Sequence, residues 1–110
     1  MTDRENSLAI HWSATYHPEW DTDPGAYVMA GLVGWGRSRR LAQATDATRA
    51  LKAYIGVHHN DPGRWGRPEL PTAAFFLSLF LFGRTVTLRT FATMPEALAE
   101  LHAFHERLQG

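Results

Sequence analysis

The run Ala-Ala-Phe-Phe-Leu-Ser-Leu-Phe-Leu-Phe, residues 73–82, decides how this chain folds. It is apolar at both odd and even positions, which is typical of a strand that is buried on both faces. Gly83 and Arg84 follow, and they predict a tight hairpin with glycine at its first central position. Residues 85–92 then alternate between apolar and polar side chains, so we expect them to return as the antiparallel partner strand.

A helix is expected directly after this hairpin. Thr93-Met94-Pro95-Glu96 forms a capping box, in which Thr93 caps the helix and Glu96 reaches back to it. The apolar residues beyond it recur at helical spacing and form one stripe: Ala97, Leu98, Leu101, Phe104 and Leu108. His105 flanks that stripe and His102 lies on its wet side, so we interpret both as structural or solvated histidines.

The first half of the chain predicts three strands and a second helix. Ser7–His17 alternates in polarity and ends at Pro18, which indicates a half-buried strand. Ala26–Val33 is apolar at every parity and predicts a central strand. A third strand is expected over 39–44, followed by a helix over 46–57.

A single helix over residues 38–58 is the alternative for that last segment. It is favoured by a set of residues at helical spacing, namely Leu41, Ala44, Thr48, Leu51 and Tyr54.

These elements predict an α+β fold with one domain, residues 1–110, because two domains would each be too small to build a core. We expect a mostly antiparallel sheet of four or five strands with two helices packed on one face. Two hairpin–helix units, beginning near Gly36 and Gly83, indicate a possible pseudo-repeat.

Composition excludes several classes of protein. There is no cysteine, so disulfide scaffolds and thiolate metal sites are excluded. Eleven basic and eleven acidic residues cancel, which excludes a globally basic nucleic-acid binder. The longest apolar run is about half of the roughly 20 residues that span a bilayer, so we expect no membrane segment and a cytoplasmic location. No cofactor, metal ion or catalytic residue is assigned.

Arginine and tryptophan occur together at two places. They predict a partner-binding site made of Trp35, Arg37, Arg39, Arg40, Arg64, Trp65 and Arg67. Both residue types are enriched at the energetic centres of protein interfaces, so a protein partner is the first expectation. Arginine also binds phosphate and aromatic rings stack on bases, so a nucleic acid is the second.

A long irregular segment, residues 57–71, separates the two halves of the chain and is rich in proline and glycine. His58, His59 and Asp61 lie in it at the end of the expected second helix. They form a possible acid–base or metal site, and they would serve a small histidine-based enzyme or ligand-binding domain.

The two-sided strand 73–82 also predicts an assembly. Helices on one face leave its other face uncovered, and a second copy of the chain would cover it. Phe76 and Phe80 are the expected homodimer interface. The leading hypothesis is therefore a non-catalytic, homodimeric protein-interaction module such as a regulator, adaptor, inhibitor or immunity-type protein.

Overall fold

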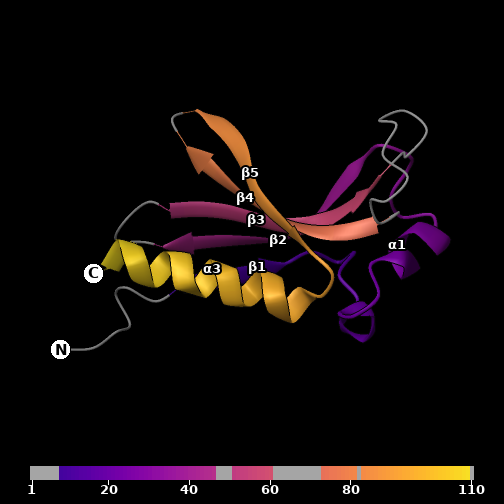
Figure 1. The fold of residues 1–110 in the computed structure, drawn as a ribbon, viewed down its shortest axis with the longest axis horizontal. Coiled ribbons are helices and arrows are strands. Elements are labelled where there is room, and N and C mark those ends of the chain that lie inside the picture. The colour runs from indigo at the N-terminus through magenta and orange to yellow at the C-terminus, as the bar shows by residue number, and fades with distance from the viewer. Residues whose placement is uncertain (1–7, 47–50, 61–72, 82, 110) are drawn as a thin grey trace.

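A five-stranded antiparallel sheet with helices forms the α+β fold of the computed structural model, which describes residues 8–46, 51–60, 73–81 and 83–109. The strands are β1 (Leu8–Trp12), β2 (Ser38–Asp46), β3 (Leu51–His59), β4 (Ala73–Leu81) and β5 (Arg84–Phe91). They are hydrogen-bonded in the order β1-β2-β3-β4-β5, and every neighbouring pair is antiparallel. The short helices η2 (Pro18–Trp20) and α1 (Gly25–Met29) lie between β1 and β2, and the long helix α3 (Met94–Gln109) follows β5 (Figure 1).

Both α-helices pack against one face of the sheet, as expected. Side chains alternate between the two faces along the strands, except at two irregularities in register, between Arg40 and Ala42 in β2 and between Leu77 and Ser78 where β4 meets β5. Ile55 of β3 and Phe75 of β4 point to the same face. They belong to one core cluster with Leu101 of α3 and Tyr27 of α1. The Tyr27 and Phe75 rings meet edge to face, with their centroids 6.3 Å apart. We call this side of the sheet the core face and the other side the open face.

The capping box holds the start of α3. The Thr93 N–H donates to Glu96 Oε1 over 3.1 Å, and the Glu96 N–H lies 3.4 Å from Thr93 Oγ1. The Met94 N–H also donates to the Asp21 carbonyl over 2.7 Å, which ties α3 to the segment after η2. No helix in the described ranges has the length and apolar composition that crossing a bilayer requires.

A buried acid–imidazole contact fixes the far part of α3 to the sheet. His105 Nε2 lies 2.7 Å from Asp46 Oδ2 at the end of β2, and both residues are buried. His102, three residues earlier on α3, is exposed. The interpretation of both histidines as structural or solvated is confirmed.

The predicted helix 46–57 is wrong, and so is the alternative helix 38–58. Residues 51–59 form β3, in which the odd-numbered side chains from Leu51 to Val57 are buried on the core face. The described residues that suggested the longer helix belong to two adjacent strands, β2 and β3, while Thr48 lies outside the described residues. The pseudo-repeat therefore lacks its first helix.

The N-terminal expectations also need correction. Residues 26–33 do not form a strand: α1 covers the first part and a turn with Gly31 at φ 76° ends it. An apolar run without alternation is compatible with either structure. The first strand ends at Trp12 rather than His17, because the Ser13 side chain accepts a hydrogen bond from the Thr15 N–H and turns the chain.

The β4–β5 hairpin is present, with one change in register. Leu81 pairs with Arg84, so Arg84 is the first residue of β5 and Gly83 is the second residue of the connection. Gly83 has φ 84°, a left-handed conformation that glycine adopts readily.

Gly56 in β3 lets an aromatic ring lie flat on the open face. Its cross-strand partner is Phe76 in β4, and a Cβ added at Gly56 would lie 2.6 Å from Phe76 Cε2 and collide with the Arg39 carbonyl oxygen. A glycine within a strand marks such a close approach. The Phe76 ring therefore takes the place of the missing side chain.

We expect His105→Ala to lower the free energy of unfolding by about 3–5 kcal/mol, because it breaks a buried contact between an imidazole and a carboxylate. His102→Ala is the matched control on the exposed side of α3 and should change it by less than about 0.5 kcal/mol. Urea denaturation followed by circular dichroism measures both. Equal effects of the two substitutions would contradict a role for the Asp46 contact.

We expect Gly56→Ala to destabilise the fold by about 1–3 kcal/mol, the usual cost of overpacking. At Gly34 an added Cβ would have its nearest neighbour 3.7 Å away, so Gly34→Ala serves as the control. Thermal unfolding of both variants is the measurement. A Gly56→Ala protein as stable as the parent would show that Phe76 does not need this glycine.

Candidate functional site

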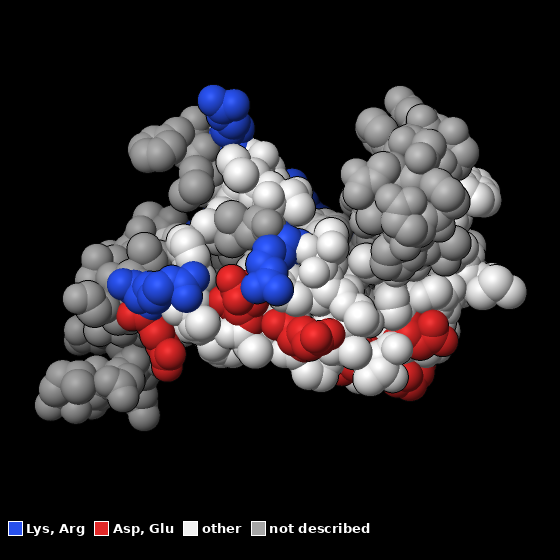
Figure 2. Space-filling model, viewed as in Figure 1, with Lys and Arg blue, Asp and Glu red and all other residues white. Residues whose placement is uncertain are grey.

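The open face of the sheet carries no helix in the described structure and no acidic side chain among its described residues. Alternation and register place these polar and aromatic side chains on it: His11, Ser38, Arg40, Gln43, Thr45, Lys52, Tyr54, His58, Phe76, Ser78, Phe80, Thr85, Thr87 and Thr90. The acidic side chains gather on α3 and the lower edge of the molecule in Figure 2. A ligand on the open face would therefore meet hydroxyls, rings and cations.

A hollow of about 260 Å³ lies on the open face, and we call it the Ser38 hollow. Its lining residues come from all four strands β2 to β5, namely Ser38, His58, Phe76, Thr87 and Thr90. Residues from β2 and β5 reach one hollow although two strands separate them, so the sheet is curved around this point. An aromatic surface with a few polar groups is the usual lining of a small-molecule site.

Ser38 and His58 form the polar pair of this hollow. They are cross-strand partners, and Ser38 Oγ lies 2.8 Å from His58 Nδ1. Burial lowers the pKa of His58 below its usual 6.5, and His59 next to it lowers it further, while a hydrogen bond with the Arg37 backbone opposes both. The imidazole is therefore neutral at physiological pH and offers one donor and one acceptor nitrogen.

A second hydroxyl pair supports the opposite wall. Ser78 in β4 is buried, and its Oγ lies 3.0 Å from Thr87 Oγ1 in β5. This contact orients Thr87 at the rim of the Ser38 hollow. Sequence analysis missed Thr87 and Thr90, because strict alternation over residues 85–92 places them on opposite faces. The irregularity in the β4–β5 register between Leu77 and Ser78 brings both to the open face.

The structure divides the predicted arginine cluster between the two faces. Arg39 and Arg40 lie at the beginning of β2, where they pair with residues of β3. Consecutive side chains of a strand point to opposite faces, so the two arginines point in opposite directions. The Arg39 Nε–H donates to the Leu32 carbonyl, whereas the Arg40 guanidinium lies over the Tyr54 ring. Arg37 is exposed just before β2. Arg64, Trp65 and Arg67 lie outside the described residues.

Trp35 is exposed and stacks on His59. Its side chain is 64% exposed, and the two ring centroids are 4.4 Å apart. His59 is buried, and its Nδ1 has no hydrogen-bond partner among the described residues.

The proposed pairing of His58 with His59 is not formed. They are consecutive residues of β3, not of a helix end, so their rings point to opposite faces of the sheet. Asp61 lies outside the described residues. Across the described part of the chain, no three metal-ligating side chains come together.

The two phenylalanines of the predicted dimer interface differ in exposure. Phe76 is 8% exposed within a single chain, whereas Phe80 is 40% exposed. Phe76 is thus largely covered without a second copy. Of the two residues, only Phe80 exposes enough apolar surface to contribute to the predicted interface.

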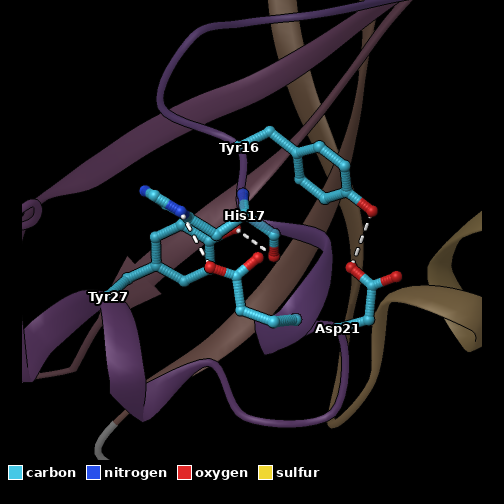
Figure 3. A network of polar contacts seen from close by, with 5 residues as sticks. Tyr16, His17, Asp21 and Tyr27 are labelled. Carbon is cyan, nitrogen blue, oxygen red and sulfur yellow. Dashed lines mark hydrogen bonds and ion pairs between the residues drawn. The ribbon is translucent and has the colours of Figure 1, made fainter.

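A separate polar network closes the end of the sheet near η2 (Figure 3). The Tyr16 hydroxyl donates to Asp21 Oδ1 over 2.8 Å, and the Tyr27 hydroxyl accepts from the His17 N–H over 2.8 Å. Burial raises the pKa of both phenols, and the Asp21 carboxylate raises that of Tyr16 further. Both phenols therefore stay protonated, and their hydrogen bonds stabilise the segment that connects β1 to β2.

The comparisons with known proteins add no relative to this geometry. No protein-family model, curated protein or solved structure matches the chain. The open face of the sheet and the Ser38 hollow are therefore the features from which a function can be inferred.

Proposed function

We propose that this protein is a small-molecule-binding domain and that the Ser38 hollow is its binding site. The observation that carries the proposal is the 2.8 Å contact between Ser38 and His58 beside the Phe76 ring, inside one concave surface. This corresponds to the ligand-binding alternative of the sequence analysis, with His58 kept and His59 moved to the other face.

The chemistry of the lining defines the body of the ligand. Phe76 offers an apolar contact, while Ser38, His58 and the two threonines offer hydrogen-bond donors and acceptors. A hollow of about 260 Å³ suits a body the size of one ring. We therefore expect an uncharged ring or short chain with one or two hydrogen-bonding groups.

Titration with phenol, benzyl alcohol and benzamide, followed by amide NMR shifts, tests the proposal. We expect at least one probe to shift residues of β2 to β5 with a dissociation constant of about 1 mM, as suits so small a ligand. Ser38→Leu fills the hollow and removes the hydroxyl, so these shifts should disappear.

Thr45→Leu is the control for that experiment. Thr45 lies on the same face of β2 but does not line the hollow, so binding should persist. Shifts that survive in Ser38→Leu, or no binding by any probe, would contradict the proposed site.

A protein-interaction module, homodimeric through the open face, is the second candidate. Exposed apolar side chains favour it: Phe80 on the open face, Trp35 before β2 and Met29 in α1, which is 87% exposed. Of these, tryptophan is the residue type that is enriched at the energetic centres of protein interfaces. A nucleic-acid partner has less support, because Arg39 and Arg40 point to opposite faces.

Phe80→Asp should convert a dimer to a monomer if the open face joins two copies, because it replaces an apolar contact by a carboxylate that the interface would have to desolvate. Ala99→Asp, on the exposed side of α3, adds the same charge elsewhere and should leave the dimer intact. Light scattering at micromolar protein concentration reports the mass of each. A parent protein that is already monomeric would rule out this second candidate.

A further inference from the structure

A second hollow lies on the open face, and the proposed function does not use it. It has a volume of about 270 Å³, and we call it the Arg40 hollow. Its floor follows one row across three strands, because His11 pairs with Gln43 and Gln43 pairs with Tyr54. Arg40 and Ser13 complete its polar lining.

Arg40 is positioned in this hollow by an aromatic ring. Its guanidinium carbon lies 3.7 Å from the centroid of the Tyr54 ring, and Tyr54 is buried. A guanidinium on a ring face keeps its N–H donors free at its edge. Arg40 belongs to none of the ion pairs found among the described residues.

The surroundings favour a negative ligand. The described residues of the open face include Lys52 and two histidines but no carboxylate, so the positive charge of Arg40 is not neutralised there. The fork of N–H donors on arginine matches a carboxylate or a phosphate group. His11, Ser13 and Gln43 would supply further hydrogen bonds.

The two hollows lie within reach of one small molecule. Ser38 and Arg40 occupy alternate positions on the same face of β2, about 7 Å apart along the strand. Gly56, the cross-strand partner of Arg40, has no side chain of its own, and the Phe76 ring that packs on it is already part of the lining of the Ser38 hollow.

We propose that the Arg40 hollow binds the oxyanion of a small organic acid whose uncharged body occupies the Ser38 hollow. This inference rests on the proposed function and adds the charge of the ligand to it. Arg40 sets specificity for the acid, and the Ser38–His58 pair binds the other end.

Calorimetric titration with 3-phenylpropanoate, phenyl phosphate and 3-phenylpropanol tests the assignment. In the parent protein at least one of the two anions should bind about tenfold more tightly than the alcohol, since a charge-assisted hydrogen bond contributes about that factor. The preferred anion identifies the acid as a carboxylate or a phosphate. Arg40→Gln should remove the preference.

Lys52→Gln is the matched control, because Lys52 is a cation on the same face outside both hollows. It should change the affinity for the acid by less than about twofold, as expected for a more distant, screened charge. An anion preference that persists in Arg40→Gln, or an alcohol that binds as tightly as the acids, would overturn the inference.

Ser38→Leu separates this inference from the proposed function. Binding that depends on Ser38 but not on Arg40 overturns only the oxyanion site. Binding that depends on Arg40 but not on Ser38 overturns the proposed function and the two-hollow ligand together. Inorganic phosphate that competes as well as phenyl phosphate would also exclude a ligand body in the Ser38 hollow.

Discussion

One long helix covers only one face of the five-stranded sheet, and the rest of this structure depends on that constraint. The core face receives α3 and α1, and the apolar side chains of β3 and β4 that point to it are buried. The buried contact between Asp46 and His105 joins α3 to the end of β2. Breaking a buried pair of this kind lowers the free energy of unfolding, so the contact fixes the position of the helix on the sheet. The other face carries no helix among the described residues.

The open face buries part of its apolar surface without a helix. Phe76 packs onto Gly56, and the curved sheet brings side chains of β2 and β5 around one hollow. Burial there is partial, so hydroxyls and a neutral imidazole remain accessible next to an aromatic ring. The acidic side chains among the described residues lie on α3, in the core contact and in the segment around η2. The molecule therefore separates a face that stabilises the fold from the face for which we propose ligand binding.

Part of the candidate site could be predicted from the sequence and part could not. His58 and Arg40 were both identified as candidate functional residues, because imidazole and guanidinium groups are chemically distinctive. Their grouping with neighbours in the sequence failed, since alternation in a strand sends Arg39 and His59 to the opposite face from Arg40 and His58. The pairing of Ser38 with His58 spans twenty residues of sequence and requires the register of β2 with β3.

Local patterns alone determined the β4–β5 hairpin, the capping box of α3, its apolar stripe and the α+β class. Each of these depends on residues within a few positions of one another, whose propensities and hydrogen bonds act locally. The tertiary structure alone decided that residues 51–59 are a strand. A helical spacing also fits part of this region, at Leu41, Ala44, Leu51 and Tyr54. In the structure, however, β3 pairs with β2 and β4, which satisfies its backbone hydrogen bonds. This pairing buries one face of β3, namely Leu51, Ala53, Ile55 and Val57. Only this long-range pairing places Ser38, His58 and Phe76 around one hollow, because no local pattern encodes which strands become neighbours.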